Sequence, residues 1–290
     1  MTIPPPAAPP SQFRRSIRPF GLIIGFYFIA FLLIAIFGAT GEAALGEASL
    51  DEGGILMQWV TLAATLTATY VMLRRVEKLP WATIGLDASA AKAPVLLKGA
   101  AYGAVAIGVA SMGLVAVQQL RIVATPDGSW WGTAARAAAV LLPAAFFEEL
   151  FIRGYAFSVL RRMAGWKLAL IVTSVVFGLL HAANPGANPQ SILSVTVAGF
   201  FLGALFLATG SLYAAGAAHF AWNWVMAALL HTPVSGLGMA TPDYQTVDAG
   251  PDWLTGGQWG PESGLASVSI MFLVLFYLHW RHLRRMESTA

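Results

Sequence analysis

A few polar residues interrupt an otherwise apolar chain, and their types are those of acid–base chemistry. They are Glu148, Glu149, Arg153, His181, His219 and Asn223. A carboxylate at the depth of the hydrocarbon costs several kcal/mol unless it is paired or hydrated, so ionisable residues there indicate a functional site. Because His219 and Asn223 are four residues apart, they share one face of a helix. The set is therefore a candidate site, and the rest of the chain has to position it.

A carboxylate, two imidazoles and an amide are the groups that activate water and stabilise an oxyanion. The carboxylate, beside one imidazole, takes a proton from water, and the other imidazole and the amide donate to the tetrahedral intermediate. The same groups could instead hold a divalent metal ion, with Glu148 as a ligand or as the base. The chain has no His-Glu-x-x-His, Gly-x-Ser-x-Gly or Gly-x-x-x-x-Gly-Lys run, so zincin, nucleophile-elbow and P-loop chemistry are excluded.

Each candidate also has a purely structural interpretation. Glu149 and Arg153, at positions i and i+4, could simply neutralise each other. A histidine in a membrane helix, such as His181, often makes only an interhelical hydrogen bond, and His219 with Asn223 could do the same. The joint occurrence on three helices favours a catalytic site over three separate structural contacts.

The composition predicts an integral membrane protein. Of 290 residues 57% are hydrophobic and only 11% are charged, and the mean hydropathy is +0.68. Soluble domains carry about 25% charged residues. With no cysteine, disulfides, thiolate metal sites and cysteine nucleophiles are excluded. The basic residues stand at the ends of apolar runs, so the net charge of +3 indicates membrane topology and no nucleic-acid partner.

The hydropathy pattern predicts an all-α bundle with about eight transmembrane helices. The expected spans are about 20–37, 55–73, 99–117, 132–152, 168–183, 192–208, 212–230 and 265–280. Nearly all basic residues fall in alternate loops, whereas the opposite loops carry only Arg121 and most of the acids, so both termini are expected to be cytoplasmic. We expect a disordered proline-rich tail at 1–18, one membrane domain at 19–285 with a catalytic core at about 132–230, and a short tail at 286–290.

Three motifs resemble those of the CPBP family, the CAAX proteases and bacteriocin-processing enzymes also called Abi proteins. Glu-Glu-x-x-x-Arg is matched at 148–153, Phe-x-x-x-His at 177–181 and His-x-x-x-Asn at 219–223. Each motif alone is weak, but all three occur in order on successive helices. The likeness covers about 132–230, and residues 250–262 are similar to a loop of bacterial members.

The resemblance implies an intramembrane endopeptidase. Glu148 would be the base that activates water, positioned with His181, and His219 and Asn223 would stabilise the oxyanion. Glu149 and Arg153 would support the site. A zinc ion held by Glu148, His181 and His219 and a metal-free glutamate–histidine mechanism both stay open.

The expected substrate is a membrane-associated protein or peptide, either prenylated at a CAAX end or of the leader or bacteriocin type, and the expected location is the inner cell membrane, with the lipid bilayer as surroundings. The alternative is a non-proteolytic scaffold or immunity protein of the same fold. A proton-coupled transporter ranks last, because the chain shows no pair of matching interrupted helices.

Overall fold

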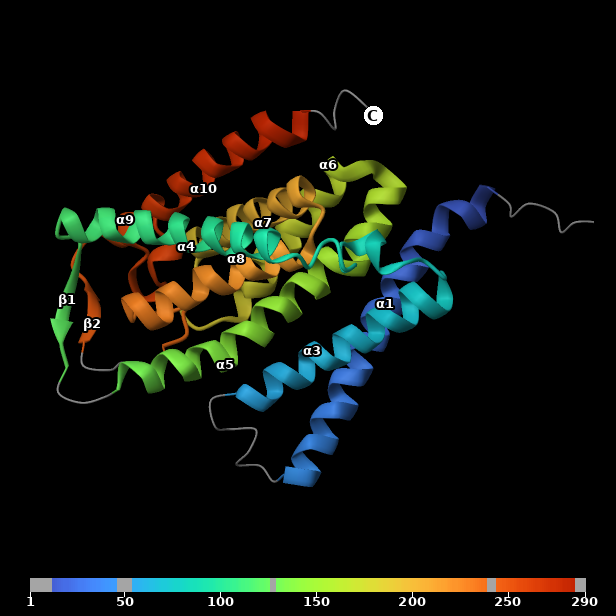
Figure 1. The fold of residues 1–290 in the computed structure, drawn as a ribbon, viewed down its shortest axis with the longest axis horizontal. Helices are drawn as coiled ribbons and strands as arrows, with labels where there is room; N and C mark the ends of the chain where they lie inside the picture. The colour runs from blue at the N-terminus through green and yellow to red at the C-terminus, as the bar shows by residue number, and fades with distance from the viewer. Residues whose placement is uncertain (1–11, 46–53, 126–128, 239–243, 285–290) are drawn as a thin grey trace, which may run out of the picture.

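The chain folds into a bundle of long helices (Figure 1) in the computed structural model, which describes residues 12–45, 54–125, 129–238 and 244–284. The long helices are α1 (Gln12–Leu45), α3 (Ile55–Tyr70), α4 (Ala93–Ala116), α5 (Trp130–Glu149), α6 (Tyr155–Leu180), α7 (Pro189–Thr209), α8 (Leu212–Trp224) and α10 (Leu265–Leu278). Each coincides with one of the predicted apolar segments, so the helical bundle is confirmed. The start of α1 corrects the predicted tail: residues 12–18, which contain no glycine or proline, are already helical.

The predicted terminal tails otherwise lie outside the described residues.

A two-stranded ribbon corrects the purely helical fold class. Strands β1 (Leu120–Ala124) and β2 (Tyr244–Asp248) pair antiparallel, with Leu120 opposite Asp248. Both stretches were expected as loops, but their β-branched residues, such as Ile122 and Val247, favour strands once a partner is present. Figure 1 shows the ribbon at one end of the bundle, away from the start of α1.

Within the described residues, six helical segments are long and apolar enough to cross a membrane. They are Ile17–Glu42, Ile55–Val76, Ala93–Ala116, Trp130–Ala183, Pro189–Thr209 and Leu265–Leu283. The fourth, of 54 residues, contains two of the expected spans, and α8 is not among the six. Most residues of α8 are buried against other helices, so they need not be apolar as lipid-facing residues must be. Its small and polar residues lower its hydropathy, which explains why α8 is not among the six. The protein is a multi-pass membrane protein; eight crossings and cytoplasmic termini remain predictions.

The connection from α5 to α6 differs from the expected short span. The chain continues through a π-helical turn, Leu150–Gly154, into α6. Its backbone departs from helical torsion angles at Gly154, where ψ is −116°, and again at Gly165, where φ is 81° and ψ is 167°. Arg161 and Arg162, expected in a loop, are therefore helical. Buried Tyr155 and Phe157 give this extension an apolar face, so the helix does not end at the arginine motif.

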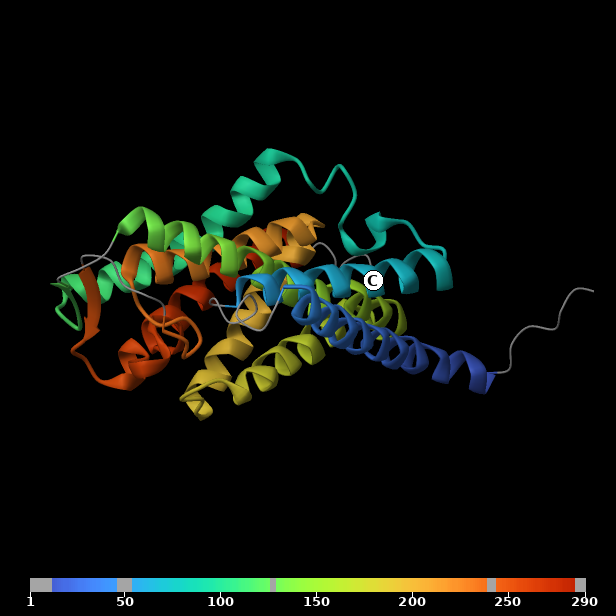
Figure 2. The same cartoon turned by 90° about the horizontal axis from the view of Figure 1, so that it is seen from below.

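Two glycines let α4 and α8 lie side by side (Figures 1 and 2). A Cβ on Gly99 would lie 2.2 Å from the carbonyl oxygen of Ala214, and one on Gly103 would lie 1.9 Å from that of Ala218. The spacing of four residues is that of a small-xxx-small helix interface. Ala218 precedes His219, so this close approach fixes the height of one site residue.

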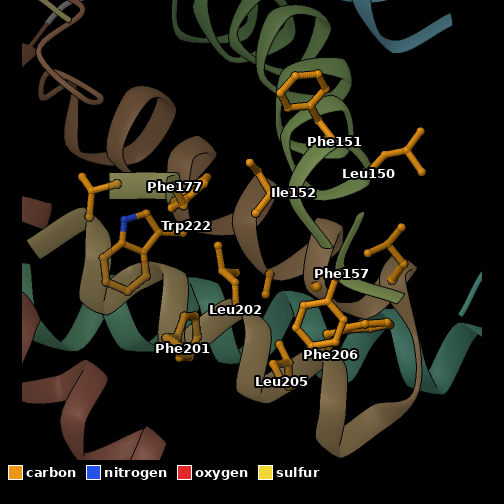
Figure 3. Close-up of a cluster of buried hydrophobic side chains, with 14 of the residues drawn as sticks. Leu150, Phe151, Ile152, Phe157, Phe177, Phe201, Leu202, Leu205, Phe206 and Trp222 are labelled. Atoms are coloured by element: carbon orange, nitrogen blue, oxygen red, sulfur yellow. The ribbon is translucent and has the colours of Figure 1, made fainter. Parts of the chain in front are cut away.

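The core lies where α5, α6, α7 and α8 meet. Figure 3 shows the labelled side chains of the π-turn, among them Ile152, gathering with those of α6, α7 and α8, including Phe177, Phe201 and Trp222. The helices that carry the motifs, α5, α6 and α8, are therefore packed together with α7. Such a core restricts the motif side chains to a single arrangement.

Candidate active site

The C-terminal end of α5 presents its two adjacent carboxylates to different surroundings. Residues one apart differ by about 100° around a helix. The side chain of Glu148 is 31% exposed and lines a cavity, whereas that of Glu149 is fully buried. The two glutamates therefore have separate roles: Glu148 faces the space where a substrate can enter, and Glu149 faces the core.

Glu149 is the centre of a buried polar network. Its Oε1 accepts a hydrogen bond from the Arg153 guanidinium at 2.8 Å, and both side chains are fully buried. The same oxygen lies 3.1 Å from Nδ1 of His219. Arg153 also donates to the carbonyl of Gly199 on α7 at 3.2 Å and stacks over the Phe177 ring at 4.2 Å. The expected Glu149–Arg153 pair is thus present, and it ties α5 to α7 and α8.

The hydrogen bonds of the two imidazoles define how each ring faces the cavity. An ionised Glu149 only accepts, so Nδ1 of His219 carries a proton. Nδ1 of His181 lies 2.8 Å from the carbonyl oxygen of Phe177, which also only accepts. The Phe177 ring contacts both imidazoles, with centroids 4.8 Å from His181 and 5.9 Å from His219. Both rings therefore turn Nε2 in the same direction.

That direction is toward Glu148. Its Oε2 lies 3.8 Å from Nε2 of His181 and 3.9 Å from Nε2 of His219, and it has no hydrogen-bond partner within the described part of the protein. These distances exceed a direct hydrogen bond. A water molecule or a substrate group placed between the three atoms can contact all of them.

Asn223 completes the motif set on the cavity wall. It lies one turn after His219 on α8, is 8% exposed and lines the same cavity. Its amide can donate through Nδ2 and accept through Oδ1. All four candidate catalytic residues therefore border one space.

The cavity has a volume of about 570 Å³. Its walls are mainly apolar, from α1, α5, α6 and the turn at 234–238, and Glu148, His181, His219 and Asn223 lie among them. Ligand sites commonly have volumes of about 300–1,000 Å³ with few polar groups among apolar walls. The space accommodates an apolar chain beside a reactive polar centre.

Counting residues from the expected span ends places His181 nearer the opposite membrane face than Glu148 and His219. The structure corrects this expectation. The bend at Gly165 lies nearly midway in sequence between Glu148 and His181, and it returns the chain so that Oε2 of Glu148 lies 3.8 Å from Nε2 of His181. Both residues therefore reach the same level.

The donors suit zinc chemically, but their arrangement does not. Each imidazole has its second nitrogen held by a carboxylate or a carbonyl, as is usual for zinc ligands. Ligands of a tetrahedral zinc ion lie about 3.3 Å apart, closer than the distances found here. Within the described residues, no group of three His, Cys, Asp or Glu side chains is placed to hold a metal ion. The metalloendopeptidase prediction is therefore not supported.

Sequence reasoning missed two residues beside this site. Ser235 lines the main cavity, and Glu262 lines a small adjoining pocket of about 30 Å³ with His181, His219 and Asn223. Glu262 stands in a loop, 231–264, that has no Lys or Arg, and its neighbours Gly260 and Pro261 indicate only a turn. Two signals were available: the absence of a cation nearby in sequence, and the similarity of this stretch to a loop of bacterial family members, which assigns no role to Glu262.

Comparison with known proteins gives one match. A family model described as type II CAAX prenyl endopeptidase Rce1-like matches residues 130–225, which contain the three motifs. Searches of curated proteins and of solved structures gave no match. Residues 130–225 are thus similar to the Rce1-like family, whose description indicates a CAAX-type membrane protease, and over this segment the match agrees with the family that the motifs predicted.

Proposed function

We propose that this protein is an intramembrane endopeptidase that cleaves a membrane-associated protein or peptide with water activated by Glu148. The observation that carries the proposal is the convergence of two imidazole Nε2 atoms on one unpaired oxygen of Glu148 inside the cavity. A purely structural glutamate would form an ion pair with a permanent cation, as Glu149 does with Arg153, whereas the ion pairs that Glu148 forms in the described residues are with histidines.

The orientation of the rings assigns separate tasks in the first step. Water between Glu148 and His181 donates one hydrogen to Oε2 of Glu148 and the other to Nε2 of His181, which accepts because Nδ1 holds the proton. The lone pair of the water then faces the carbonyl carbon of the substrate. As the C–O bond forms, Glu148 takes the proton.

His219 and Asn223 stabilise the oxyanion that results. A proton on Nε2 of His219 makes the ring a cation beside the Glu149 carboxylate, and this N–H donates to the oxyanion together with Nδ2 of Asn223. When the C–N bond breaks, the proton on Glu148 passes to the leaving amine. Water is consumed, and one carboxyl group and one amine are released.

The walls of the cavity suit a substrate with an apolar part. Phe31, Leu141, Phe147, Phe151 and Leu180 line it on the side of α1, α5 and α6. A prenyl group or an apolar leader segment would bury its surface there, at about 25 cal/mol per Å². The inner cell membrane is the proposed location.

The test compares protein termini in membranes that contain the wild type or Glu148→Gln at equal levels. Because Oε2 of Glu148 has no partner in the described protein, the isosteric amide should fold normally while losing the base. New termini that are present with the wild type and absent with Glu148→Gln are the expected result. Identical termini in both samples would refute the peptidase and favour the scaffold interpretation.

A further inference from the structure

Glu262 is a buried carboxylate whose partners are all neutral donors. It is 9% exposed and lies in the short helical turn Pro261–Ser263. Its Oε1 accepts from the backbone N–H of Ser235 at 2.7 Å and from the Ser235 hydroxyl at 2.8 Å, and its Oε2 accepts from the indole N–H of Trp222 at 3.3 Å. Among the described residues three donors and no acceptor bond to it, so only a carboxylate, which accepts on both oxygens, satisfies them all.

Ser235 needs this support because of its backbone. Its φ is 51°, in the left-handed region that a residue with a Cβ avoids at a cost of roughly a kilocalorie per mole. The carbonyl oxygen of Ser235 also accepts from Asn184 at 3.0 Å, three residues after His181. Ser235 is thus held from both sides, by Glu262 and by the end of the helix that carries His181.

The turn around Ser235 forms part of the site wall. Val234, Ser235, Leu237 and Gly238 line the main cavity, and Ser235 borders the small pocket as well. Glu262 itself lines that small pocket beside His181, His219 and Asn223. Any movement of the turn therefore changes the space in which a substrate peptide bond lies next to the catalytic groups.

Glu262 is itself fixed by its neighbours. The carbonyl oxygen of Ser263 accepts from Gln190 and Ser194 on α7, each at 2.9 Å, and the carbonyl of Pro261 accepts from Ser267 at 2.7 Å. Through these bonds Glu262 links the 234–238 turn, by way of Ser235, to α7 and α10.

We propose that Glu262 is a positioning residue for substrate binding: it holds Ser235 in the left-handed conformation and so fixes the part of the cavity wall that the 234–238 turn forms. This inference rests on the proposed peptidase function. It gives the loop 231–264 a role in shaping the site, although the loop contributes no catalytic group.

Two measurements test it. The first is hydrogen exchange of the 232–238 backbone in the purified protein, which needs no activity. The second is KM and kcat on a peptide spanning a cleavage site found by the comparison of termini. Glu262→Ala should speed exchange in 232–238 and raise KM about tenfold, which corresponds to ~1.4 kcal/mol, with little change in kcat. Glu262→Gln should lie between Glu262→Ala and the wild type.

A rescue variant separates positioning from general stability. Glycine adopts a positive φ without strain. Adding Ser235→Gly to Glu262→Ala should therefore lower KM again, although it restores no hydrogen bond to the loop. The matched control is Asp248→Ala in the same loop, whose carboxylate binds Gly250 and Thr255 and borders a different pocket, which Ser235 does not line. It should leave KM and exchange in 234–238 unchanged.

Unchanged exchange and unchanged KM in Glu262→Ala would overturn the proposal. So would a loss of activity that follows thermal stability and shows no rescue by Ser235→Gly. If the wild type cleaves nothing, the peptidase function fails, and the positioning proposal fails with it; faster exchange in Glu262→Ala would then show that Glu262 holds the turn without serving a substrate site.

Discussion

Replacing Glu149 should destabilise the protein far more than replacing its neighbour Glu148. Glu149→Ala would leave the Arg153 guanidinium buried without its carboxylate partner, and it would also remove the acceptor for Nδ1 of His219. Breaking a buried ion pair on one side costs about 3–5 kcal/mol. Glu148→Ala breaks no hydrogen bond in the described structure and should cost far less.

The assay is the unfolding of purified protein in detergent. It compares Glu148→Ala with Glu149→Ala, and it includes a double-mutant cycle of Glu149→Ala and Arg153→Met. In the Glu149→Ala background, Arg153→Met removes the stranded charge but keeps a long side chain over the Phe177 ring. The one further hydrogen bond that it breaks there is the bond to the Gly199 carbonyl. The double variant Glu149→Ala/Arg153→Met should therefore be more stable than Glu149→Ala alone. Replacement of both members of a buried pair is often close to neutral.

Two results would refute this reasoning. One is a Glu149→Ala variant as stable as Glu148→Ala. The other is a double variant whose loss of stability equals the sum of the two single losses, since residues in contact should show a coupling energy of 0.5–3 kcal/mol. Either result would mean that water or lipid reaches Arg153 and solvates it.

Three further outcomes are expected. Burial raises the pKa of Glu77, but hydrogen bonds from Arg162 and Tyr155 outweigh this effect, so the pKa is lowered. The Glu77 carboxylate therefore stabilises the fold above its unfolded pKa of about 4.3. The stability advantage of wild type over Glu77→Gln should shrink as pH falls below that value, and a constant difference would contradict the prediction. Gly103→Val should separate α4 from α8 and lower thermal stability and activity, whereas Gly108→Val on the same helix, where a Cβ meets nothing within 4 Å, should do neither. Because the ligand spacing does not suit zinc, we expect chelation of divalent metals to leave proteolysis unchanged, and a loss restored by added zinc would refute that expectation.

The helix pattern could be predicted because lipid imposes a simple rule on sequence. Apolar runs of about 20 residues are needed to cross the hydrocarbon, and each expected run corresponds to a helix in the described structure. The rule fails for a helix that neighbouring helices surround. Such a helix needs no lipid-facing surface, so α8 is not among the spans identified by length and composition.

The kinds of residue that form the candidate site could also be predicted from the sequence. Few polar residues remain within the apolar runs, and their spacing places Glu149 beside Arg153 and His219 beside Asn223. The family match covers these motifs, so local sequence is also what indicates a CAAX-type protease. The catalytic roles of the individual residues remain a proposal.

Only the tertiary structure decided which atoms meet. Glu148, His181 and His219 converge because the chain passes from α5 through the π-helical turn into α6, which bends at Gly165, and a residue count cannot place that bend. Glu262 contacts Ser235 and Trp222, which lie 27 and 40 residues away, through a loop that has no periodic pattern. Hydropathy records only whether a segment prefers lipid, whereas the depth and direction of each side chain depend on helix bends and packing between segments far apart in the chain.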